Sequence, residues 1–419
     1  MKRLAISVLC IVSALAGGHA VQAQNYGSVF DAVDRTVREN FYDPHFGGRD
    51  WSAIVDRRRV ELDAVTSDAE FQRLIQSMLS ELGVSHVLIQ APGTNRPTMG
   101  LAARWEIIDG QTIIVDIDPA SAARAAGLRI GDRIIDPSMI RGPRQDLARL
   151  DIERCDGSVV QLSLPRESAY WPPRERTISW SLLRRGDGRS VGYLRAERFG
   201  DDAAELIDAA MDTLGSTDGL IIDIRNNSGG NASALRLLGY FTDPGPGIAL
   251  LSRPFLETLD GAVEAEDLTG ILRVSRAYTT EAIFAAVAEG DGAVMLMIED
   301  LGERRYRKPV VVLIGPETGS AAEGFAWGAR EQTDAVLIGR ETAGALLSSQ
   351  PFDLPDGWRL TIPVHGNWGP DGRDFGDKKV PPHIATTLTR DAVCQGEDVD
   401  LAEATVALEQ AWGEELPAD

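Results

Sequence analysis

The second half of the chain alternates short apolar runs with periodic helical segments, and this alternation limits the fold more than any other feature. The runs are four or five residues long and rich in Val, Ile and Leu. Short apolar strands separated by helices are typical of a largely parallel α/β sheet covered on both faces. The expected strands are 191–195, 220–224, 310–314 and 335–338, and the expected helices are 203–214, 232–241, 321–330 and 398–412.

The first 23 residues predict an export signal. Lys2 and Arg3 precede an apolar run, 4–15, that is too short to cross a bilayer, and Val21 and Ala23 form a small-residue cleavage pattern. No later run is long enough to span a membrane. We therefore expect an exported protein, periplasmic or secreted, without a membrane span.

Charge and cysteine content restrict the partners. The net charge of −21 argues against nucleic acid and anionic membranes, which need a basic face. After signal removal two cysteines remain, Cys155 and Cys394, and the sequence leaves open whether they form a disulfide or two free thiols. Neither has metal-site spacing, and the chain has no phosphate loop or dinucleotide fingerprint, so no cofactor or metal is implied.

The first half divides into two regions. Residues 24–94 carry helical periodicity, and Ser67 followed by Glu70 predicts a capping box at the start of one helix. From residue 95 to residue 168 the pattern changes to short strands and turns. The segment 112–117 predicts a strand after an Asp109-Gly110 turn, and 158–164 predicts a closing strand.

Within this second region, residues 118–135 resemble a PDZ module. An Ala-rich helical stretch ends at Gly127, and Gly131-Asp132 precedes the apolar pair Ile134-Ile135. In the PDZ module, the corresponding helix and a neighbouring strand form a groove for an extended peptide. An unrelated small β-domain is the alternative interpretation.

Ser320 follows the expected strand 310–314 and opens the helix after it. A serine at such a turn lies at the carboxyl edge of the sheet, where open α/β sheets bind ligands. The helix N-terminus behind it offers free N–H groups that can stabilise an oxyanion. The structural alternative is an ordinary N-cap, since Glu323 completes a capping box.

A second motif, residues 223–231, also joins a buried strand to a helix. Its Gly229 and Gly230 allow the backbone to approach a ligand closely and to direct an N–H group at it. The alternative is a tight structural turn.

Together the two motifs, the strand between them and the PDZ-like segment resemble the carboxyl-terminal processing and tricorn-core serine peptidases. The resemblance covers nearly all of the mature chain. It implies a crotonase-like ββα core, residues 169–419, with an irregular elaboration at about 244–307, a helical segment at 24–94 and a PDZ-like domain at 95–168. It also implies that Ser320 is the nucleophile, and that Ala321 and Gly229 or Gly230 supply the oxyanion N–H groups.

The same resemblance gives two ways to activate the serine. One branch of the family uses a lysine where this chain has Ala345, which disfavours a Ser–Lys dyad. The other uses a histidine just before the PDZ module, and this position holds His86, with Ser85 as the residue that orients it. An imidazole suits general acid–base work near neutral pH. His365 is the competing base.

The third catalytic member is less well defined by the sequence. Direct alignment places Gly376 where the family has a glutamate, and Asp377 and Asp374 are the nearest carboxylates. We favour Asp377 and keep Asp374 as the alternative. Val87 also replaces a threonine common in relatives, so a weak or inactive enzyme stays open.

Three functions follow from these patterns. The leading one is a serine peptidase that acts on extended or unfolded polypeptides. The alternatives are a non-catalytic binder of peptide or apolar ligands, and a scaffold that uses only the PDZ-like groove. The expected strands 348–353 and 359–364 would border the cleft, where a peptide can pair with an exposed strand.

Overall fold

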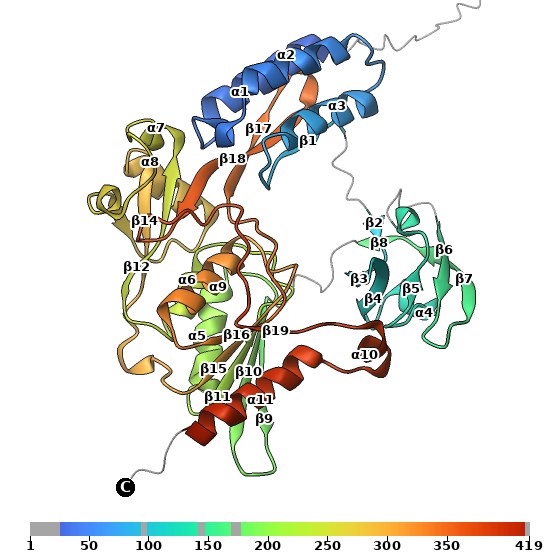
Figure 1. Cartoon of the computed structure of the whole chain (residues 1–419), viewed down its shortest axis with the longest axis vertical. Coiled ribbons are helices and arrows are strands. Elements are labelled where there is room, and N and C mark those ends of the chain that lie inside the picture. Colours follow the sequence, from blue (N-terminus) through green and yellow to red (C-terminus); the bar gives the residue numbers. More distant parts are fainter. Residues whose placement is uncertain (1–25, 94–98, 141–146, 169–176, 415–419) are drawn as a thin grey trace, which may run out of the picture.

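The computed structural model describes residues 26–93, 99–140, 147–168 and 177–414 of the 419-residue chain. Three N-terminal helices lie at one end of the molecule, a body of two sheets lies below them, and a small β-domain lies to one side (Figure 1). The expected export signal lies outside the described residues. Within these ranges, no helix combines the length and apolar character needed to cross a membrane.

The first sheet of the body confirms the expected α/β core. Its strand order is β19-β16-β15-β11-β10-β9, and every neighbouring pair is parallel except β9 with β10. β11 and β15 are buried along their whole length, as their continuous apolar runs predict. The bounds are β9 (Ile178–Arg184), β10 (Ser190–Ala196), β11 (Gly219–Asp223), β15 (Val310–Ile314), β16 (Val336–Gly339) and β19 (Ile384–Ala385).

Helices cover both faces of this sheet. On one face α5 (Ala203–Leu214), α6 (Ser233–Leu238) and α9 (Ala321–Gln332) pack in the largest apolar cluster. On the other face α11 (Val399–Glu414) packs through Leu408 and Trp412. The helix expected at 232–241 is shorter in the structure, since α6 ends at Leu238.

A second sheet has the order β1-β18-β12-β14-β13, with β17 also paired to β18. The segment 244–307, expected to be irregular, supplies three of these strands. Strand β12 is hard to predict from the sequence because Gly and Pro residues precede its apolar run. The bounds are β1 (Leu88–Gln90), β12 (Gly245–Ser252), α7 (Arg253–Leu256), β13 (Leu272–Val274), α8 (Thr280–Glu289), β14 (Ala293–Ile298), β17 (Ser348–Asp353) and β18 (Arg359–Trp368).

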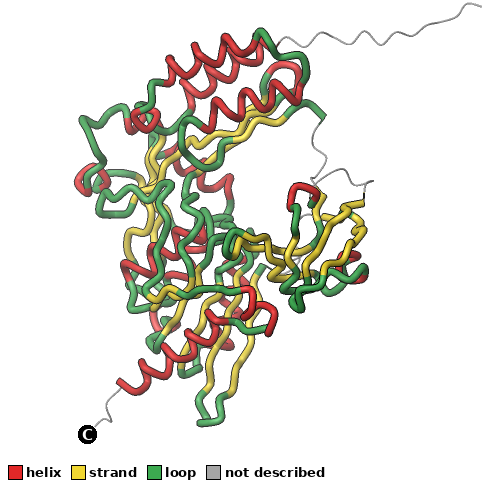
Figure 2. Tube along the Cα trace, turned by 45° about the vertical axis from the view of Figure 1, so that its right-hand side comes forward, coloured by secondary structure: helices red, strands yellow, loops and turns green. Residues whose placement is uncertain are grey.

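The N-terminal helices are α1 (Tyr26–Asn40), α2 (Trp51–Leu62) and α3 (Asp68–Ser80), and they lie along the outer part of β17 and β18 (Figures 1 and 2). Their apolar faces form one cluster with Trp358 and Leu360, and the Phe71 and Trp358 rings meet edge to face at 4.8 Å. The Ser67 side chain accepts a hydrogen bond from Glu70 N, which is one half of the predicted capping box, but the Glu70 carboxylate accepts from Thr66 N and Oγ1.

The small β-domain (residues 99–168) contains a five-stranded antiparallel sheet in the order β3-β4-β5-β6-β7 with its own apolar core. The expected strands 112–117 and 158–164 are present as β4 and β7. The bounds are β2 (Met99–Gly100), β3 (Ala103–Ile108), β4 (Gln111–Ile117), α4 (Ala122–Ala125), β5 (Arg133–Ile134), β6 (Leu147–Glu153), β7 (Val159–Pro165) and β8 (Glu167–Ser168).

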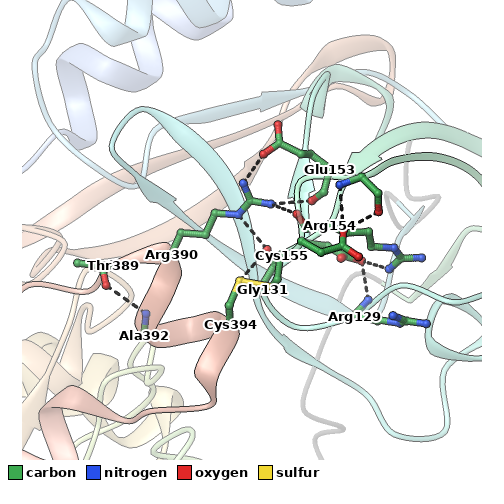
Figure 3. The surroundings of a disulfide bond; sticks show 12 residues. Arg129, Gly131, Glu153, Arg154, Cys155, Thr389, Arg390, Ala392 and Cys394 are labelled. Atoms are coloured by element: carbon green, nitrogen blue, oxygen red, sulfur yellow. Dashed lines mark hydrogen bonds and ion pairs between the residues drawn. A yellow bond between two sulfur atoms is a disulfide. The ribbon is translucent and has the colours of Figure 1, made fainter.

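A C-terminal arm (residues 386–398), which contains α10 (Arg390–Gln395), joins this domain to the core. Cys394 forms a disulfide with Cys155, with the two Cα atoms 5.8 Å apart. Arg390 donates hydrogen bonds to backbone carbonyls of Gly131, Glu153 and Arg154 (Figure 3). The sequence left the state of the two cysteines open, and the structure pairs them.

Candidate active site

Ser320 lies between the carboxyl end of β15 and the first residue of α9. Its backbone has φ 52° and ψ −127°, a conformation that costs energy for a residue with a Cβ and that is concentrated at functional sites. The turn is held below by Thr318, whose hydroxyl donates to Ile224 O at 2.8 Å and accepts from Gly315 N at 3.0 Å. The strained turn therefore presents a half-buried serine at the edge of the sheet.

The glycines after β11 lie against this turn. A Cβ on Gly229 would be 2.5 Å from Ser320 Cβ, and a Cβ on Gly230 would be 1.9 Å from Phe199 O. Both have positive φ, of 108° and 145°. Only glycine fits either position without moving backbone, so the sequence pattern reflects a close approach of two chain segments.

The three N–H groups proposed for the oxyanion hole differ in their partners. Gly229 N donates to Asn227 Oδ1 at 2.9 Å. Across the described residues, Gly230 N and Ala321 N donate to no protein acceptor. Of the two glycines, Gly230 is therefore the one whose N–H remains available to a ligand.

Ser85, His86 and Asp377 form a second group, here called the base cluster. Asp377 accepts from Ser85 Oγ at 2.6 Å and from Ser85 N at 3.0 Å. Ser85 Oγ lies 2.8 Å from His86 Nδ1. Because the single Ser85 hydroxyl proton points to Asp377, Ser85 Oγ accepts from His86 Nδ1–H. This arrangement leaves His86 Nε2 unprotonated in the neutral ring.

Electrostatics in the base cluster favour a neutral imidazole. Desolvation lowers the pKa of His86 below its ordinary value, and the charge of Asp377 acts in the opposite direction. The pKa of Asp377 is raised, chiefly by desolvation, although its hydrogen bonds from Ser85 and the nearby imidazole lower it. His86 keeps an exposed face, so its ring is accessible to a substrate.

The structure does not bring the two groups into direct contact. No hydrogen bond joins Ser320 and His86 in the part of the chain that is described. Two loops connect them: residues 342–348, here called the pocket-wall segment, and residues 376–380. Leu346 N donates to Gly376 O at 3.2 Å, and Val380 N donates to Thr342 Oγ1 at 2.8 Å.

A small apolar pocket of about 70 Å³ opens beside Ser320. Leu346, Leu347 and Ser348 of the pocket-wall segment form one side, and Asn367 of β18 lies at another. Asn367 Nδ2 donates to Leu346 O at 3.0 Å, which fixes that wall. The remaining lining comes mainly from α6, β12 and Ile283 of α8.

The alternative candidates have other surroundings. Asp374 accepts from Gly376 N at 2.9 Å and pairs with Lys378, so it caps a turn instead of contacting Ser85. His365 is buried in β18 against the Phe284 ring, and burial lowers its pKa to about 4. Among the described residues, no group of three or more His, Cys, Asp or Glu is arranged to hold a metal ion.

Comparison with known families agrees with this geometry. The profile of peptidase family S41 matches residues 190–386, which include both glycines and Ser320, and that of the tricorn protease C1 domain matches residues 22–80. Residues 190–386, just under half of the chain, therefore belong to peptidase family S41. By family the chain is a serine-type peptidase.

The relatives of this chain include both tricorn protease homologues and carboxyl-terminal-processing peptidases. The putative tricorn protease homolog 2 of Streptomyces coelicolor is 28% identical over 51% of this chain and 21% of its own length. The carboxyl-terminal-processing peptidase 3 of Arabidopsis thaliana is 22% identical over 90% of this chain and 72% of its own. The carboxy-terminal processing protease CtpA of Bacillus subtilis is 24% identical over 69% and 56%, so the chain spans only part of these proteins.

Solved structures share the fold. The photosystem II D1 C-terminal processing protease matches 89% of this chain and 97% of its own, with 18% identity and a TM-score of 0.56. Mature CPAF matches 94% and 99%, with 16% identity and a TM-score of 0.65. The fold of most of the chain is therefore one found in solved structures.

Sequence reasoning missed the pocket-wall segment and its contact with Glu323. Glu323 is an N3 glutamate in a predicted capping box, and its carboxylate does accept from Ser320 N at 3.1 Å. It also accepts from three donors in the pocket-wall segment, about 20 residues further along the chain. The local pattern is the same with or without those contacts, so no sequence signal distinguishes them.

Proposed function

We propose that this S41 peptidase hydrolyses peptide bonds in extended or unfolded polypeptides, with Ser320 as nucleophile and His86 as general base. The observation that carries the proposal is Ser85, which donates to Asp377 and accepts from His86 Nδ1. This chain of hydrogen bonds fixes the tautomer and leaves Nε2 as the proton acceptor.

In the proposed mechanism, Ser320 Oγ attacks the scissile carbonyl carbon while His86 Nε2 takes its proton. The N–H groups of Ala321 and Gly230 stabilise the negative oxygen of the tetrahedral intermediate. The His86 imidazolium then protonates the leaving amine, and water hydrolyses the acyl-enzyme by the same route. Catalytic hydrogen bonds often form only in the substrate complex, so we expect His86 to reach Ser320 when peptide is bound.

The surroundings of Ser320 suggest how the peptide is held. β17 pairs with β18 along one edge only in the described fold, and it begins at Ser348 in the wall of the pocket. A substrate strand can pair with the free edge of β17 by β-augmentation. The pocket volume and its Leu and Ile lining then favour a small apolar side chain before the cleaved bond.

The small β-domain, residues 95–168 in the expected division, is proposed to be a PDZ-like module inserted before a crotonase-like core, 169–419. In support, β3 is an edge strand of its sheet, and α4 begins at a capped Ser121. In a PDZ module such a strand and helix hold an extended peptide, so this domain would bind the polypeptide away from Ser320.

We also propose that the protein works outside the cytoplasm. The apolar N-terminal run supports export. The disulfide between Cys155 and Cys394 supports it independently, because such bonds persist in oxidising compartments.

The experiment is cleavage of unfolded casein by the mature protein, beside Ser320→Ala, His86→Ala and the exposed control His45→Ala. Loss of about 10³-fold or more in the first two, with the control unchanged and all four folded, is the expected result. Equal cleavage by the Ser320→Ala variant would refute the assignment. Absence of cleavage by the unsubstituted protein on casein and on a set of apolar-tailed peptides would refute the substrate class.

A further inference from the structure

Glu323, in the first turn of α9, is a fully buried carboxylate with four hydrogen-bond donors. Oε2 accepts from Ser320 N at 3.1 Å and from Ala345 N at 2.7 Å. Oε1 accepts from Thr342 Oγ1 and Gly344 N, both at 2.6 Å. No Lys, Arg or His in the described chain pairs with it, so uncharged donors alone satisfy this buried acid.

These contacts extend well beyond a helix cap. A capping glutamate needs only the bond to Ser320 N. The other three bonds attach the pocket-wall segment to the turn that carries Ser320. The same segment contacts Val380 through Thr342, and Gly376 through Leu346, on either side of Asp377. Glu323 therefore lies where the serine turn, the apolar pocket and the loop of the base cluster meet.

We propose that Glu323 is a positioning residue, which holds Ser320 in register with the substrate pocket and with the Asp377–Ser85–His86 cluster. This inference rests on the function proposed above and assigns a role that the mechanism did not use. Glu323 touches neither substrate nor a transferred proton. It acts through the pocket-wall segment, and a shift of this segment by a fraction of an ångström would move the pocket and the base cluster relative to Ser320.

The charge state of Glu323 suits this role. Burial raises its pKa, and the four donors favour the ionised form. Every neighbour donates, so an O–H or N–H group placed there would face other donors. Glutamine has the shape of glutamate but only one acceptor oxygen. In Glu323→Gln, the donors that face the amide nitrogen therefore lose their acceptor, while the volume of the side chain is kept.

The test compares Glu323→Gln with Glu299→Gln, a second buried carboxylate, which pairs with Arg236 and Arg276 and, in the described chain, is bonded neither to Ser320 nor to the pocket-wall segment. Three quantities are measured for folded enzyme: kcat and KM on peptides with Ala or Leu before the cleaved bond, and amide exchange over residues 342–346. In Glu323→Gln we expect kcat to fall about 10- to 100-fold and the Ala-to-Leu preference to change. Exchange at Gly344 and Ala345 should become faster.

Thr342 provides a matched pair of variants for the same contact. Thr342→Ser keeps the hydroxyl that donates to Glu323 and accepts from Val380 N, and Thr342→Val removes both of these bonds. The first should resemble the unsubstituted enzyme, and the second should change kcat and residue preference in the direction of Glu323→Gln.

A merely structural cap would give a different pattern. Lower thermal stability in Glu323→Gln, with unchanged kcat for folded enzyme and an unchanged Ala-to-Leu preference, would overturn the proposal. Failure of the proposed function appears separately, as cleavage that survives Ser320→Ala. In that case faster exchange at Gly344 and Ala345 in Glu323→Gln still supports the proposal that Glu323 holds the pocket-wall segment, and unchanged exchange overturns it.

Discussion

The small β-domain and the N-terminal helices are both attached to the S41 core, but by different forces. The small β-domain is held by the Cys155–Cys394 disulfide, by Arg390 and by an Arg340–Glu106 ion pair. Few apolar residues join it to the core, namely Ile108, Ile113, Val115, Leu388 and Val393. The N-terminal helices instead share a large apolar cluster with β18.

The difference matters because, of these two regions, only the N-terminal one carries proposed catalytic residues. Its helices are fixed by burial, but His86 lies on the loop after α3, and its contacts there are those with Ser85 and Asp377. The loop itself is anchored by Val84 and Val87, which pack against the apolar cluster of the N-terminal helices, whereas the orientation of the His86 ring depends on a few hydrogen bonds. The orientation of the small β-domain depends instead on the Cys155–Cys394 disulfide, and neither cysteine takes part in the proposed catalysis.

The largest effect should follow from a change at Asp377. Asp377→Asn removes the negative charge and leaves one acceptor oxygen for the two Ser85 donors, Oγ–H and N–H, which disturbs the orientation of Ser85 and, through it, the tautomer of His86. We expect kcat to fall by about 10²- to 10⁴-fold, as measured with the peptide or casein substrate.

Asp374→Asn is the matched control for this prediction, because Asp374 lies on the same loop and does not contact Ser85. It should retain cleavage within about threefold. If the two variants lost equal activity, the distinction between the carboxylates would be wrong.

Removal of the disulfide should affect stability more than activity. In Cys155→Ser/Cys394→Ser, we expect the free energy of unfolding to fall by about 2–4 kcal/mol, measured by denaturant titration. Cleavage by the folded variant should stay within a few-fold, because no catalytic group lies in that region. A loss of cleavage as large as that of Asp377→Asn would show that the position of the small β-domain controls the chemistry, which contradicts the comparison.

The smallest expected effect is a shift in the pH dependence of kcat/KM. Catalysis needs neutral His86, and its pKa is lowered, so activity should rise with pH through a midpoint below the ordinary histidine value of about 6.5. In Asp377→Asn the midpoint of the residual activity should move lower still, because the anion that raises the pKa of His86 is gone. A midpoint above 6.5 in the unsubstituted enzyme would contradict this view of the base cluster.

The sequence predicted those parts of the fold that depend on local pattern. Strand β15, the turn at Ser320 and helix α9 follow from a continuous apolar run, a strand-to-helix turn and helical periodicity. The choice between Asp377 and Asp374 could not be made in the same way, because the partner, Ser85, is 292 residues away. The contacts of Glu323 could not be predicted for the same reason, because its capping pattern is local and its three other partners lie further along the chain.

The most direct test of the Ser320–His86 mechanism is covalent labelling with a fluorophosphonate, which forms a bond to an activated serine oxygen and releases fluoride. The modified residue is identified by mass spectrometry, and the rate is compared among the unsubstituted protein, His86→Ala and His45→Ala. We predict an adduct on Ser320 that forms at the same rate in His45→Ala and about 10²-fold or more slowly in His86→Ala. An adduct on another serine, or undiminished labelling of Ser320 in His86→Ala, would contradict the mechanism.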